Sequence, residues 1–154
     1  MNRAHKSINH LLVRLFNDIL AIEERALSAG AFSDASVREM HVLEAAGAER
    51  EGNSMSAIAT RLGITVGSLT VAVTTLERKG YLRRERSTDD KRVVRVLLTE
   101  RGRQANERHA AFHAEMVEQV QEELTGEQLE VLAGALERII AFFEHYDVER
   151  PSQR

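Results

Sequence analysis

The stretch from Ser54 to Thr99 constrains this chain more than any other, because two short helical patterns in it are followed by two strand patterns. Apolar residues at helical spacing mark the first helix, which ends at Gly63. Glycine readily adopts the left-handed conformation that ends a helix. Thr65 follows, and its side-chain oxygen can cap the next helix. These signals predict a helix-turn-helix.

The second helix of this pair has two different faces. Leu69, Ala72, Val73 and Leu76 recur at helical spacing and form a stripe that we expect to be buried. The opposite face, which includes Val71, carries short polar or methyl-bearing side chains that suit base edges and phosphates in a major groove. Each hydroxyl there could contact a base, a phosphate or neither. The predicted DNA contacts of this recognition helix are Thr65, Gly67, Ser68, Thr70, Thr74, Thr75 and Arg78.

A charged β-hairpin is predicted after the helix. Strand-like residues 81–86 and 92–98 flank turn residues at 87–91. From Ser54 to Arg103 there are 11 Lys and Arg against 5 Asp and Glu, a net charge of +6 in a chain whose total is −3. A basic centre in an acidic chain is typical of a duplex-binding surface. The predicted contacts of this wing are Arg84, Arg86, Asp90, Lys91 and Arg92, with Arg83 as a further phosphate contact.

Several of these residues also resemble a known family. Asp90-x-Arg92 and Leu98-Thr99-x-x-Gly102, after a helix that ends in Leu76–Gly80, are similar to the MarR family of winged-helix repressors. The resemblance covers most of the chain and implies a mainly α fold with a small β-hairpin wing, an α+β winged helix-turn-helix. It also implies that Arg92 enters the minor groove and that Asp90 orients an arginine. A solvated charge on the hairpin is the alternative for Arg92.

A narrower likeness is to the branch of the family that represses fatty-acid synthesis genes, the FabT type. It is carried by Ile22-Glu23-Glu24, Glu39-Met40-His41, residues 76–81, Arg92-Val93-Val94 and residues 108–117. This resemblance implies an acyl-acyl carrier protein as corepressor. An apolar tunnel for the acyl chain would then be needed.

Both ends of the chain carry apolar seams. Ile8, Leu11, Leu15 and Ile19 recur along a predicted helix at 4–27, and two further helices are predicted between Glu100 and Leu124 and after Thr125. The resemblance implies that residues 1–30 and 100–147 build a homodimer around a winged module at 31–99, with a flexible tail at 148–154. An intramolecular core would show the same periodicity and stays open. Two recognition helices in a dimer can read a pseudo-palindromic operator in double-stranded DNA.

A shorter helix, capped by Ser36 and spanning about Arg38 to Ala46, is expected to brace the module. Residues 49–53 are expected to form a solvated loop with no further role. The chain has no cysteine, no apolar run long enough for a bilayer and no signal peptide, so we expect a cytoplasmic protein. No nucleophile motif or phosphate-binding loop is present, so we expect no enzymatic activity and no cofactor.

Four residues form a candidate effector pocket. His109 and His113 are four residues apart on one helix, and the resemblance to MarR-type zinc sensors implies that Glu24 and His41 could join them as ligands. FabT-like proteins resemble this chain at the same positions and are not known as zinc sensors, and the second zinc site with its cysteine is not matched. We therefore expect a polar set that lines an effector pocket, without a metal. Metal binding and a plain surface or core role are the alternatives.

Three functions follow from these features. The first is a DNA-binding repressor controlled by acyl-acyl carrier protein or a small apolar ligand. The second is a MarR regulator that responds to zinc or another small molecule. The third is a winged-helix scaffold for protein interactions without a specific operator.

Overall fold

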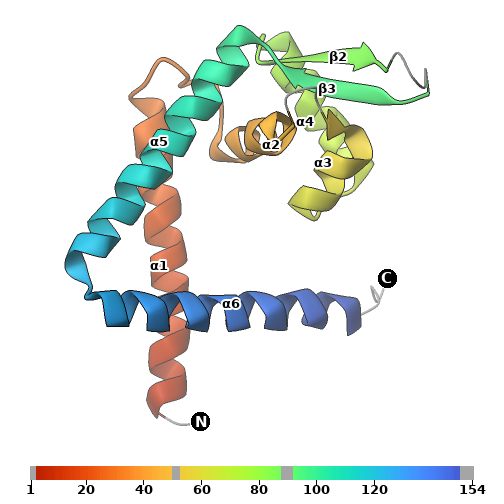
Figure 1. Ribbon diagram of the computed structural model, residues 1–154. Coiled ribbons are helices and arrows are strands. Elements are labelled where there is room, and N and C mark those ends of the chain that lie inside the picture. The colour runs from red at the N-terminus through yellow and green to blue at the C-terminus, as the bar shows by residue number, and fades with distance from the viewer. Residues whose placement is uncertain (1–2, 50–52, 88–91, 150–154) are drawn as a thin grey trace. The chain divides into compact units, whose positions relative to one another are not determined.

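The computed structural model describes residues 3–49, 53–87 and 92–149 (Figure 1). The chain divides into two compact units, Met1–Phe112 and His113–Arg154, which are described separately. In chain order the elements are α1 (Arg3–Ser28), α2 (Val37–Gly47), β1 (Asn53–Ser54), α3 (Met55–Leu62), α4 (Val66–Arg78), β2 (Leu82–Arg86), β3 (Val94–Leu98), α5 (Glu100–Glu123) and α6 (Gly126–Glu149). The predicted class, mainly α with a small wing, is confirmed.

Local side-chain chemistry begins and ends the short helices where the sequence predicts. Ser36 starts α2 with a capping box, in which its hydroxyl accepts from the Glu39 N–H and the Glu39 carboxylate accepts from the Ser36 N–H. Gly63 ends α3 with a φ of 64°, in the left-handed region. A side chain at that φ would be strained, which accounts for the glycine.

Three antiparallel strands form the sheet, in the order β1-β3-β2. β2 and β3 make the predicted hairpin, with Arg84 opposite Val96. β1 was not predicted, and the expectation that Asn53 belongs to a loop without a role is wrong. Asn53 pairs with Val96, and its side-chain amide donates to the Ala45 carbonyl at the end of α2, over 3.1 Å. A two-residue strand is too short to show an alternating pattern.

The core of the first unit lies between α2, α3, α4 and the sheet, with Ala105 of α5 included. The predicted stripe of α4 is confirmed, because Leu69, Val73 and Leu76 are fully buried and Ala72 is partly buried. In Figure 1 these helices gather beside the β2–β3 hairpin. This packing holds α4 against the sheet and leaves its opposite face to solvent. The largest fully buried side chains are Tyr81, Met40, Leu43, Ile58, Leu69, Leu76, Leu82, Val42, Val73 and Val96.

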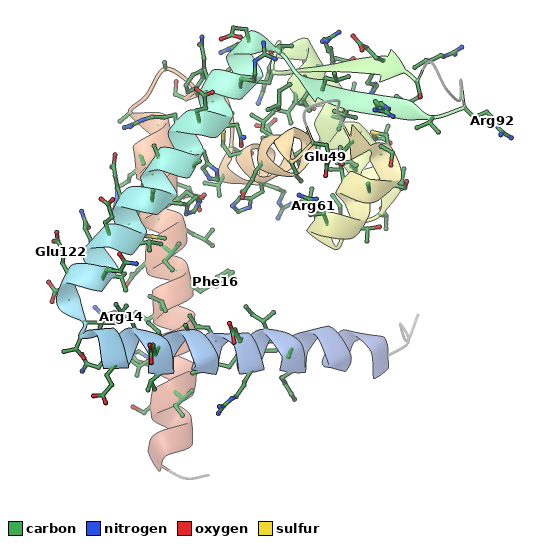
Figure 2. The ribbon with its side chains drawn as sticks, in the orientation of Figure 1. Arg14, Phe16, Glu49, Arg61, Arg92 and Glu122 are labelled. Atoms are coloured by element: carbon green, nitrogen blue, oxygen red, sulfur yellow. The ribbon has the colours of Figure 1, made fainter. Side chains whose placement is uncertain are left out.

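The long helices differ from this core. α1 exposes large apolar side chains along its length, among them Phe16, which is 69% exposed and labelled in Figure 2. In the second unit α6 does the same with Val131, Ile140, Phe142 and Phe143. These faces fit the predicted dimerisation region, which stays a prediction.

The C-terminal helix is longer than predicted. α6 extends to Glu149, so the first two residues of the expected tail at 148–154 are helical, and the flexibility of this tail stays a prediction. Residues 150–154 lie outside the described part of the chain. Across the described residues, no single helix has the length and apolarity needed to cross a membrane; α3 and α4 meet that test only jointly, across a bend of 107°.

Candidate nucleic-acid interface and histidine cluster

The turn between α3 and α4 sets the direction of the recognition helix. The Ile64 N–H donates to the Ala59 carbonyl and closes the end of α3. Thr65 then caps α4 by accepting from the Ser68 N–H over 3.1 Å, as the sequence predicts. The Thr65 hydroxyl itself donates to the Ser68 hydroxyl. The predicted contact residues Thr65, Gly67 and Ser68 therefore lie in the first turn of α4, the part of a recognition helix that usually reaches the bases.

Further along α4, Thr70, Thr74 and Arg78 are exposed on one side of the helix, whereas Thr75 is partly buried. All three threonine hydroxyls are engaged with the helix backbone. Thr70 donates to the Val66 carbonyl, Thr74 to the Thr70 carbonyl and Thr75 to the Val71 carbonyl. Such bonds to the carbonyl four residues back are a common arrangement for threonine within a helix.

Arg84 connects the wing to the recognition helix. Its guanidinium donates to the Thr74 hydroxyl over 2.8 Å and forms an ion pair with Glu77 over 3.1 Å. The Arg84 backbone N–H also donates to the Glu77 carboxylate. Arg84 was predicted as a DNA contact, and its structural partners show that it joins β2 to α4. A phosphate contact by Arg84 stays a prediction.

Of the remaining wing residues, Arg86 and Arg92 lie toward the turn of the hairpin, whereas Arg83 lies near the start of β2. Arg86 is exposed at the end of β2, and Arg83 is exposed in an ion pair with Glu85. Figure 2 shows Arg92 beyond β3, at the far end of the wing. This position fits a side chain that enters a groove beside the one occupied by α4. The predicted contacts Asp90 and Lys91 lie outside the described residues.

A polar network fixes the base of the module. Asp34, in the loop before α2, accepts from the Tyr81 hydroxyl over 2.5 Å and from Arg101 over 3.0 Å. The Lys79 ammonium group donates to the Asp34 carbonyl and to Glu39. Because these groups come from four parts of the chain, the network ties α4, β2 and α5 to the start of α2. This network was not predicted, because no local sequence pattern links residues such as Asp34 and Arg101, which are 67 positions apart.

The contacts within this network shift the pKa values of its titratable side chains. The hydrogen bond from Tyr81 lowers the pKa of Asp34, burial opposes this, and Arg101 adds to the lowering. Burial and the bond to Asp34 raise the pKa of Tyr81 above its ordinary value. Burial tends to raise the pKa of Glu39, but the hydrogen bonds from Lys79 and Ser36 outweigh it and lower that pKa. Asp34 and Glu39 are therefore held as carboxylates.

A second cluster joins α1, α2 and the first half of α5. Glu23, His41 and His109 offer ligand atoms that all lie within 4.8 Å of one another. The His109 Nε2 lies 2.5 Å from the Glu23 carboxylate, and the His41 Nε2 lies 3.4 Å from the same oxygen. Glu23 and His109 are buried, whereas the His41 side chain is 44% exposed. The cluster is therefore reachable from solvent on the His41 side.

The acidic member of this cluster was predicted one residue too far along the chain. Glu24 is exposed, and Glu23 takes the position beside the histidines. Consecutive helical residues point about 100° apart, so only one of the two can face inward. Glu23 lies four residues after Ile19 and four before Leu27, and this periodicity was the signal available. His113 follows His109 by one helical turn on α5.

Comparison with known proteins agrees with this geometry. The MarR family matches residues 36–94, from the cap of α2 to the start of β3. The HTH-type transcriptional regulator TtmR of Methylorubrum extorquens (strain PA1) is 42% identical over 55 residues, which is 36% of this chain. The match spans only 28% of the length of that regulator.

Solved structures match over much more of the chain. The FabT of Streptococcus pneumoniae, crystallised in complex with DNA, is 35% identical, with a TM-score of 0.88 over 92% of this chain and 99% of that one. The S. aureus MepR–DNA complex, 20% identical, matches 88% of this chain and 97% of that one with a TM-score of 0.74, and supports the fold. The chain therefore belongs to the MarR family of winged-helix transcriptional regulators, which are DNA-binding proteins and not enzymes.

Proposed function

We propose that this protein is a dimeric repressor of the FabT type, which binds a pseudo-palindromic operator near fatty-acid synthesis genes. The observation that carries the proposal is the 35% identity to the S. pneumoniae FabT in complex with DNA, sustained over 92% of this chain. The basic wing and the exposed face of α4 are the surfaces that such an operator would contact.

The exposed apolar residues of the long helices support a dimer. Ile8, Leu11 and Leu15 on α1 are each more than half exposed, and they follow one another at helical spacing. An apolar stripe of this length favours contact with another protein surface. A symmetric dimer would cover the stripe and present two recognition helices to successive turns of the duplex.

Acyl-acyl carrier protein is the proposed corepressor. Within the first unit, Glu23, Leu27, Arg108, His109 and Phe112 line a cavity of about 30 Å³. That volume suits a water molecule or an ion, whereas drug-sized ligands occupy roughly 300–1,000 Å³. An acyl chain would therefore need space completed by the partner subunit. The effector acts only if it binds the DNA-competent dimer more tightly than the other form.

The test is fluorescence anisotropy with labelled fragments of the protein's own and neighbouring promoters, at fixed salt. The purified protein is titrated alone, with long-chain acyl-acyl carrier protein and with the unacylated carrier as the matched control. Specific binding that tightens only with the acylated carrier supports the proposal. Specific binding that ignores the acyl chain contradicts the FabT-type effector. Equal affinity for all duplexes with a steep salt dependence contradicts an operator-specific repressor and favours the scaffold.

A zinc-responsive regulator is the second candidate, and the Glu23, His41 and His109 cluster favours it. One carboxylate and two imidazoles are ligands typical of zinc. The alternative is a buried hydrogen bond between His109 and Glu23, which needs no metal. Calorimetric titration with zinc separates the two. Micromolar or tighter binding that His41→Ala abolishes supports the zinc site, and absence of binding contradicts it.

A further inference from the structure

The recognition helix exposes apolar as well as polar side chains on the face away from the core. Val71 is 69% exposed and Val66 is 47% exposed, both on the side of α4 away from the core. Thr70 and Thr74 are exposed as well, one turn apart on the same side. Their hydroxyl hydrogens are already donated to the carbonyls of Val66 and Thr70, each over 2.7 Å. Neither hydroxyl is therefore free to donate to a base unless it gives up this bond.

Thr74 is restricted further by the wing. Its hydroxyl oxygen accepts from the Arg84 guanidinium over 2.8 Å while its hydrogen goes to the backbone. Arg84 is itself held by the Glu77 carboxylate, so this arrangement does not depend on Thr74 alone. The Thr74 hydroxyl has thus given its one hydrogen to the backbone and one of its two acceptor lone pairs to Arg84, so the γ-methyl is the main group that Thr74 presents to a neighbouring molecule. The Thr70 oxygen can still accept hydrogen bonds, but its hydrogen, like that of Thr74, is already donated to the backbone.

We infer that α4 recognises DNA chiefly through apolar contacts of Thr70, Val71 and Thr74 with the 5-methyl groups of thymines in the major groove. This inference rests on the proposed operator binding and names what the recognition helix reads. The thymine methyl is the one apolar group that base pairs display in that groove. The half-sites should therefore contain thymines beneath the middle of α4.

The surroundings of these three residues fit a close apolar approach. Gly67 lies one turn earlier on α4, and a methyl built there would meet nothing closer than the Thr65 hydroxyl at 3.8 Å. The helix backbone can therefore come near the base edges at this point. Polar side chains lie toward the two ends of the helix, where Ser68 and Arg78 are exposed.

The first experiment removes only the methyl groups from the DNA. A duplex is selected by the full-length protein from a randomised library, and copies are made with deoxyuridine in place of each thymine. Uracil keeps every hydrogen-bonding group of thymine, so a change in affinity reports the methyl alone. We expect two or three thymines per half-site at which uracil weakens binding by about fourfold each, from the burial of one methyl group.

The second experiment identifies the side chain. Thr74→Val keeps a methyl and removes the hydroxyl, whereas Thr74→Ser keeps the hydroxyl and removes the methyl. We expect Thr74→Val to bind the thymine duplex within about twofold of the wild type. Thr74→Ser should lose about fourfold and should no longer distinguish thymine from uracil at one position. Thermal unfolding of both variants confirms that the fold is kept, and Val71→Ala provides the same test at the neighbouring position.

The outcomes are distinct. Uracil duplexes that bind as tightly as thymine duplexes overturn the inference and leave operator binding intact. Loss of binding in Thr74→Val with retention in Thr74→Ser also overturns it, because the hydroxyl would then be the reading group. A selection that enriches no sequence overturns the proposed operator binding itself, and the inference with it.

Discussion

Apolar side chains are buried in the winged module and exposed on the long helices. In the module, residues such as Leu43 and Leu69 are fully buried within a single chain. On α1, Leu11 and Leu15 occupy an equally regular helical pattern and remain more than half exposed. The same periodicity therefore produces a core in one place and an open face in the other. Periodicity therefore identifies the apolar face of a helix, but it does not show what covers that face.

The largest effect is expected from substitutions on the exposed apolar face of α1. Leu11→Glu combined with Leu15→Glu puts charges into the proposed dimer face, so the protein should become monomeric. Loss of the second recognition helix should then weaken operator binding by roughly 100-fold to 10,000-fold. Analytical ultracentrifugation and anisotropy measure the two effects. Asn17→Glu, an exposed polar position on the same helix, is the control and should stay dimeric.

The next largest effect is expected on the stability of the winged module. Leu69→Ala removes a fully buried side chain of α4 and should lower the free energy of unfolding by about 2–5 kcal/mol. Val71→Ala, on the exposed side of the same helix, should change it by less than about 0.5 kcal/mol. Urea denaturation measures both variants. Equal losses would show that the exposed face of α4 is covered in the folded protein.

A smaller effect concerns the wing. Arg92→Ala should weaken operator binding by about 1–3 kcal/mol if this residue reads the minor groove. Arg83→Ala should produce a smaller loss that is similar for all DNA sequences, because a phosphate contact carries no sequence information. Anisotropy with the selected and a scrambled duplex separates the two. Unchanged affinity in Arg92→Ala would remove the wing tip from the interface.

Removing the cap at the start of α2 should have a smaller effect on stability. Ser36→Ala removes the cap that accepts from the Glu39 N–H and should cost about 1 kcal/mol of unfolding free energy. Ser33→Ala, an exposed serine in the loop before it, is the matched control and should be neutral. Thermal unfolding compares them. A neutral Ser36→Ala would mean that the capping box contributes nothing in this context.

The smallest effect is a pH dependence. The Tyr81 hydrogen bond lowers the pKa of Asp34 in the folded protein below its ordinary value of 3.8. Asp34 therefore contributes stability above pH 3.8, and this contribution is lost as the pH falls through the lowered folded value. Asp34→Asn keeps an acceptor for Tyr81 but cannot titrate, so its unfolding free energy should fall less steeply with acid. Identical slopes in urea titrations of both proteins would contradict this.

Much of the winged module could be predicted from the sequence because its signals are local. The cap at Thr65, the glycine at 63 and the stripe of α4 each depend on neighbours within one or two turns. The family motifs in the wing likewise lie within a short stretch of chain. Physical interactions over such distances leave their trace directly in residue order.

Tertiary structure decided the rest. It placed Glu23 rather than Glu24 beside the histidines, since the rotation of α1 is fixed by what it packs against. It paired Asn53 with β3, and it turned Arg84 toward Thr74 and Glu77. Local sequence patterns were enough to predict a MarR-like winged helix with a basic wing. Contacts between distant segments decide which polar atoms remain available to a ligand. A local sequence pattern cannot show such contacts.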